Sequence, residues 1–72
     1  MKDKPAITEG ERRVRLSFNP GGIQEVAEVK QKAAQLIDMI YCAGKDARCS
    51  KLAMTAFEEG AMWAVKSLTA DD

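Results

Sequence analysis

Two long stretches of the chain carry apolar residues at the spacing of an α-helix. In residues 23–42 the apolar positions form one seam: Val26, Val29, Ala33, Leu36 and Ile40. Residues 46–68 form a similar seam: Met54, Phe57, Ala61, Ala64 and Leu68. A period near 3.6 predicts two helices, each with one face turned to a core and each about 30 Å long. Gly44 suits the end of the first helix and Asp46 the N-cap of the second. The short linker predicts an antiparallel hairpin.

Each predicted helix also carries a second apolar stripe beside the first. The first helix adds Ile23, Ala27, Ala34, Ile37 and Tyr41. The second adds Ala53, Ala56, Gly60 and Trp63, although the ordinary interpretation of Trp63 and the methionines is a place in the core. Because a lone hairpin needs only one stripe per helix, we predict an all-α, homo-oligomeric helical bundle.

The residues before the hairpin show no helical period. Residues 1–12 are polar and contain Pro5 and Gly10, so we expect a flexible tail followed by one domain over residues 13–72. Val14, Leu16 and Phe18 then alternate with polar residues, which predicts an extended arm. The breaker at residues 19–22, Asn-Pro-Gly-Gly, ends this arm.

Size and composition favour assembly over other sources of stability. A chain of 72 residues buries a modest core. Cys42 and Cys49 are too few for a disulfide framework or a zinc site, and we expect free, buried thiols rather than a single bridge. No signal peptide or membrane span is expected, because no long apolar run is present.

The charge is balanced overall but uneven along the chain. Eleven basic residues match eleven acidic ones. Residues 1–20 contain five basic and three acidic residues, or +2, and the remainder contains six and eight, or −2. This distribution argues against a general DNA-binding protein and fits a local anion site near residues 12–15.

Lys30 is the main anomaly of the pattern, because it lies inside the apolar arc of the first helix. Such a lysine either extends its side chain to water or meets an anion. The guanidinium groups of Arg12, Arg13 and Arg15 suit phosphate oxygens and base stacking, and the alternative is a solvated run of charge.

Five further residues have two open interpretations each. Phe18 is either a base-stacking platform or a plug that pins the arm, and Asn19 either caps the first helix or binds a ligand. Lys32, Arg48 and Lys51 form either a second anion site between subunits or an ordinary solvated face.

The sequence does not support an enzyme, a metal site or a resident cofactor. It contains no histidine, and the adjacent Glu58 and Glu59 point about 100° apart on a helix. Gly21-Gly22 is no phosphate-loop motif, and neither cysteine has a base partner in a recognisable motif.

Three runs of sequence resemble a known family. They are the arm and turn at residues 13–20 (Arg-Val-Arg-Leu-Ser-Phe-Asn-Pro), residues 34–38 (Ala-Gln-Leu-Ile-Asp), and residues 53–66, which include Ala-Met-Trp-Ala-Val-Lys. Over about residues 13–68 the chain resembles small phage anti-CBASS proteins, which act as cyclic-nucleotide sponges. Their helical hairpin domain is shared with phage anti-Thoeris sponges.

The resemblance implies a hexamer that acts in the cytoplasm of the infected bacterial host. It would bind cyclic dinucleotides such as cGAMP between subunits, and in some members cyclic trinucleotides near a three-fold axis. The signal would be sequestered without cleavage. In the family a lysine early in the first long helix meets phosphate, and Lys30 aligns there. The family's arm supplies an aromatic that stacks on a base. This arm has no tyrosine, so either Arg15 or Phe18 would stack on the base, or the base preference would differ.

The residue pattern and the resemblance together predict a principal ligand site made of Arg12, Arg13, Arg15, Phe18, Asn19 and Lys30. A second site would use Lys32, Arg48 or Lys51. The first alternative is a helical module that binds a host protein through its apolar faces. The second is an accessory protein that binds polymeric nucleic acid, against which the zero net charge argues.

Overall fold

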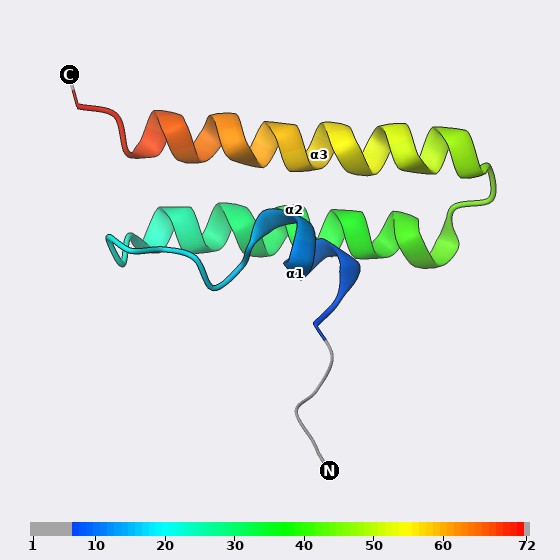
Figure 1. The fold of residues 1–72 in the computed structure, drawn as a ribbon, viewed down its shortest axis with the longest axis horizontal. Coiled ribbons are helices and arrows are strands. Elements are labelled where there is room, and N and C mark those ends of the chain that lie inside the picture. Colours follow the sequence, from blue (N-terminus) through cyan, green and yellow to red (C-terminus); the bar gives the residue numbers. More distant parts are fainter. Residues whose placement is uncertain (1–6, 72) are drawn as a thin grey trace, which may run out of the picture.

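Three helices make up the described part of the chain. The computed structural model describes residues 7–71 and contains α1 (Glu9–Val14), α2 (Gln24–Ala43) and α3 (Ala47–Leu68). The long helices α2 and α3 run antiparallel side by side, and α1 packs across the middle of this pair (Figure 1). The prediction of an all-α helical hairpin is confirmed. Residues 1–6 of the expected tail lie outside the described residues.

The ends of the hairpin helices lie within one or two residues of the predicted ones. The Asp46 side chain accepts a hydrogen bond from the Cys49 N–H at 2.7 Å, as expected for an N-cap. The Gly44 N–H donates to the Ile40 carbonyl at 2.8 Å. Gly44 is extended rather than left-handed, and it is needed because an added Cβ would lie 2.7 Å from the Ile40 carbonyl oxygen and closer still to Ser50 Oγ.

The expected extended arm is wrong, because a short helix occupies its first part. Thr8 Oγ1 accepts from the Glu11 N–H, and the Glu11 carboxylate accepts from the Thr8 N–H, each at 3.0 Å. This capping box satisfies two backbone donors that would otherwise be unpaired at the helix start. The period-two pattern was only three apolar residues long, and the capping box outweighs it. The expected boundary between residues 12 and 13 therefore falls inside α1.

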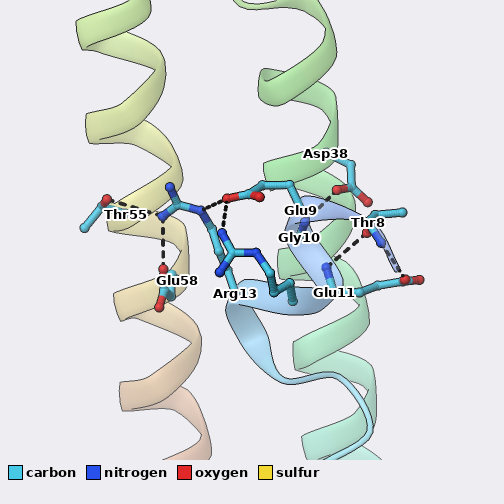
Figure 2. A network of polar contacts seen from close by, with 9 residues as sticks. Thr8, Glu9, Gly10, Glu11, Arg13, Asp38, Thr55 and Glu58 are labelled. Carbon is cyan, nitrogen blue, oxygen red and sulfur yellow. Dashed lines mark hydrogen bonds and ion pairs between the residues drawn. The ribbon is translucent and has the colours of Figure 1, made fainter. Parts of the chain in front are cut away.

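Helix α1 is fixed to α2 at a glycine. Gly10 is buried, and a Cβ at this position would lie 2.7 Å from the Cα of Ala34. The Gly10 N–H donates to the Asp38 side chain at 2.7 Å (Figure 2). The core then forms from all three helices: Val14, Ala33, Ala34, Ile37, Met54 and Ala61. Since α1 covers one side of α2, the most buried position is Ile37, whereas Leu36 of the predicted seam is 43% exposed.

Large apolar side chains remain exposed on the hairpin. Trp63 is 60% exposed, so its expected place in the core is wrong for the single chain. The other large exposed apolar residues include Met39, Tyr41, Leu52 and Met62. Cys42 and Cys49 are unbridged as predicted, but both are exposed rather than buried. Within residues 7–71, no helix has the length and apolar character needed to cross a membrane.

Candidate functional site

Arg15 ends α1 in a conformation that ordinary residues avoid. Its φ of 55° and ψ of 60° place it in the left-handed region, which favours glycine. The Leu16 N–H donates back to the Glu11 carbonyl at 3.1 Å, which is the long bond of a Schellman motif. An arginine held where glycine is easier suggests that the side chain itself is needed.

Lys30 is buried and directed at the same segment. Only 7% of this residue is exposed, and its Nζ donates to the carbonyl of Arg15 at 3.1 Å and of Phe18 at 2.5 Å. The sequence analysis expected the Lys30 ammonium to reach either water or an anion. In the structure it binds two backbone carbonyls instead. Burial lowers the pKa of Lys30, and the nearby positive charge of Arg15 lowers it further. Within the described residues no carboxylate lies within ion-pair distance of Lys30.

The Phe18 ring lies close to both of these cations. Arg15 Cζ is 5.0 Å from the ring centroid and Lys30 Nζ is 5.4 Å from it. Both contacts are within the range of cation–π attraction. The ring is nevertheless 56% exposed, so Phe18 is not the buried plug that one interpretation expected. An exposed aromatic ring close to two positive charges suits a planar, anionic ligand.

Asn19 closes the turn that leads into α2. Its side-chain amide donates to the Ile23 carbonyl at 2.8 Å, and its Oδ1 accepts from the Ile23 N–H at 3.3 Å. Gly22 takes the left-handed conformation that this turn requires, with φ of 61°. Asn19 therefore fixes the loop between α1 and α2. The interpretation of Asn19 as the cap of the first helix is wrong, because the N-cap is Ile23 and it has no side-chain cap hydrogen bond.

Two neighbouring hollows meet at Lys30. The first, called here the cationic hollow, has a volume of about 320 Å³ and is lined by Arg13, Val14, Arg15, Lys30, Glu58, Ala61, Met62 and Val65. The second, called here the loop hollow, has about 410 Å³ and a mostly apolar lining that includes Phe18, Asn19, Ile23, Val26 and Val65. Together they offer apolar surface beside a pair of positive charges.

Arg13 is committed to carboxylates of the protein itself. Its Nε lies 2.7 Å from Glu9 Oε2, and its Nη1 lies 3.0 Å from Glu58 Oε1 and 3.4 Å from Thr55 Oγ1 (Figure 2). These bonds link α1 to α3, and the Glu9 bond is the main cause that raises the pKa of Arg13. The same bond, with that of Arg12, lowers the pKa of Glu9. Arg13 therefore positions helices in this structure rather than offering a free guanidinium.

The other residues predicted to bind ligand are more exposed than Arg13 and Lys30. Arg12 is mostly exposed, with Nη2 2.7 Å from Glu9 Oε2. Lys32, Arg48 and Lys51 are all exposed. The sequence interpretation missed the contribution of α1 and of Glu58, Met62 and Val65. The Thr8…Glu11 spacing was the available signal for α1, whereas nothing in the sequence marked the lining residues of α3.

These features define a small, all-helical hairpin module within residues 7–71. It has a cationic hollow beside an exposed aromatic ring, and no group of three potential metal ligands was found within residues 7–71. The family model described as "Acb2/Tad1, hairpin domain" matches residues 9–69, so the chain belongs to this family. The match begins at the first residue of α1, which makes this helix part of the domain. No curated protein and no solved structure matches the chain.

Family membership confirms the resemblance to the anti-CBASS and anti-Thoeris sponges. It implies a phage sponge for cyclic nucleotide signals, which binds its ligand and is not an enzyme.

Proposed function

We propose that this protein sequesters cyclic oligonucleotide immune signals intact and thereby blocks CBASS-type defence in the cytoplasm of the infected host. The ligands are cyclic dinucleotides such as cGAMP, and cyclic trinucleotides are further candidates. The observation that carries this proposal is the pair of cations, Arg15 and Lys30, that both lie close to the exposed Phe18 ring. A phosphate placed there would relieve the repulsion between two cations, and a base would cover the ring.

The proposed site divides the work among six residues. Arg15 and the remaining donor of Lys30 bind phosphate, and Phe18 stacks on a base. Asn19 holds the loop in place through its two bonds to Ile23. Arg12, which is mostly exposed, closes over the phosphates. Arg13 holds α1 against α3 beside the site, because its guanidinium is bonded to Glu9 and Glu58.

The proposed active form is a homo-oligomer, with a hexamer as the expected number. The open faces of α2 and α3 support this, since exposed apolar residues such as Met39, Leu52 and Trp63 would be covered by neighbouring subunits. In such an assembly Lys32, Arg48 and Lys51 are proposed to converge on a second site for cyclic trinucleotides.

The test is isothermal titration against a panel of cyclic di- and trinucleotides, with the ligand recovered after the protein is denatured. Submicromolar binding and release of unmodified ligand would support a sponge. Lys30→Ala should weaken binding at least about tenfold while the oligomer stays intact, because it removes a buried charge-assisted donor. Lys45→Ala, at an exposed lysine in the turn between α2 and α3, is the matched control.

Two outcomes would contradict the proposal. No binding across the panel would exclude these ligands, and unchanged affinity of Lys30→Ala would remove Lys30 from the site. A second candidate function, a module that binds a host protein, is favoured only by the exposed apolar faces. A monomeric mass without cyclic-nucleotide binding would support that candidate instead.

A further inference from the structure

A carboxylate lies in the cationic hollow. Glu58 of α3 lines this hollow together with Arg15 and Lys30. A carboxylate repels phosphate, so its presence beside a proposed phosphate site requires a reason. The inference that follows rests on the proposed function and concerns which base the same site selects.

Arg13 holds the Glu58 carboxylate in place. Arg13 Nη1 lies 3.0 Å from Glu58 Oε1, and Arg13 is itself fixed by Glu9 Oε2 at 2.7 Å from its Nε (Figure 2). A carboxylate has about four acceptor positions, and this contact uses one of them. The Glu58 side chain is 33% exposed, so the other acceptor positions remain accessible from the hollow. Glu58 is thus a preorganised acceptor that lacks further described protein donors.

We propose that Glu58 makes the ligand site selective for guanine. Guanine presents two donors, N1–H and the N2 amine, on one edge, and these match the two oxygens of a carboxylate. Adenine presents one amine beside an acceptor nitrogen. Uracil presents one N–H between two carbonyl oxygens, which a carboxylate repels. Since hydrogen bonds to a charged group are stronger than neutral ones, guanine gains most from this contact.

The same geometry orients the ligand. Glu58 is an acceptor on α3, whereas Arg15 and Lys30 are cations at the end of α1 and on α2. Phosphates are attracted to the cations and repelled by the carboxylate, so the base edge rather than the phosphate meets Glu58. Arg13 acts as a positioning residue for this contact, because it fixes the Glu58 carboxylate.

The test measures a ratio of affinities by titration calorimetry, using cyclic di-GMP and cyclic di-UMP. The wild-type protein should bind cyclic di-GMP more tightly. Glu58→Gln should reduce the affinity ratio at least about tenfold, because cyclic di-GMP loses a charge-assisted contact while cyclic di-UMP loses a repulsion. The variant keeps an acceptor for Arg13. Glu59→Gln makes the same charge change at the neighbouring exposed position and should leave both affinities unchanged.

A measurement on the wild-type protein covers the case in which the Glu58 variant does not fold. Cyclic di-IMP lacks only the N2 amine of each guanine and should bind about tenfold more weakly than cyclic di-GMP. Equal affinities for cyclic di-GMP and cyclic di-IMP would overturn the guanine contact. So would an equal loss of affinity for cyclic di-GMP and cyclic di-UMP in Glu58→Gln. Either result leaves the sponge function standing. If the wild-type protein binds no cyclic dinucleotide at all, the proposed function fails and the guanine inference fails with it.

Discussion

At the scale of single residues, the unusual features gather around one loop. Arg15 is left-handed, Lys30 is buried, and Phe18 is exposed, each against the ordinary preference of its residue type. The three contact one another through cation–π and backbone hydrogen bonds. Departures from local preference that converge on one place are typical of a functional site.

The variant Arg15→Gly should lower ligand affinity without lowering the stability of the fold. Glycine relieves the left-handed strain, so the free energy of unfolding should be unchanged or higher by about 1 kcal/mol. Ligand affinity should fall about tenfold or more, because the proposed phosphate contact is lost. Thermal melts followed by circular dichroism and titration calorimetry measure the two effects. Ser17→Gly, two residues away in the same exposed loop, should not alter binding. Full affinity in Arg15→Gly would exclude its side chain from the site.

At the scale of elements, α1 is a small helix that depends on its contacts with α2 and α3. Six residues cannot form a stable helix alone, because the unfavourable free energy of helix nucleation exceeds the stabilisation from so few hydrogen bonds. Additional stabilisation comes from the capping box, from the Gly10 contact with α2 and from the Arg13 bonds to α3. The position of Arg15 therefore depends on contacts made several residues before it.

Gly10→Ala should displace α1 although alanine favours helices. The added Cβ would overlap the backbone of Ala34, so we expect a loss of about 1–3 kcal/mol in the free energy of unfolding. Ligand affinity should fall as well, because α1 positions Arg15. Urea unfolding followed by circular dichroism gives the stability. Gln35→Ala, at the exposed position next to Ala34, should not destabilise the protein. A stabilised Gly10→Ala variant would contradict the close packing.

At the scale of the whole molecule, the chain is a thin layer. Its Cα atoms extend over only 12 Å along the shortest axis. Two helices side by side cannot bury two apolar stripes each, and α1 covers only part of one face (Figure 1). On the open face of α3, a Cβ added at Gly60 would meet no atom within 4 Å. Glycine inside a helix is unfavourable there unless something approaches it closely.

Gly60→Glu should dissociate the assembly without unfolding the helices. In the single chain the new side chain has open space, and glutamate forms helices better than glycine. In an assembly packed through this face, the charge would be buried without a partner. Sedimentation analysis should show a smaller mass for Gly60→Glu than for the wild type. Gln35→Glu adds the same charge on the exposed side of α2 and should keep the wild-type mass. An unchanged mass for Gly60→Glu would place the subunit contacts elsewhere.

The sequence by itself determined the hairpin, because its signals are local. A helical period over about twenty residues, an aspartate N-cap and a glycine stop are each read from neighbouring positions. The family resemblance likewise followed from contiguous runs and is confirmed. The capping box of Thr8 and Glu11 was equally local, and the polar composition around it masked the short helix that it begins.

Only the tertiary structure decided how the site is built, because its contacts join residues far apart in the chain. Lys30 reaches the carbonyls of Arg15 and Phe18, and Arg13 reaches Glu58 across 45 positions. Whether a buried lysine meets water, an anion or a carbonyl depends on which segment packs over it, and no local pattern encodes that choice. The sequence shows that Lys30 lies in an apolar arc. The path of the chain after α1 decides what its ammonium group binds.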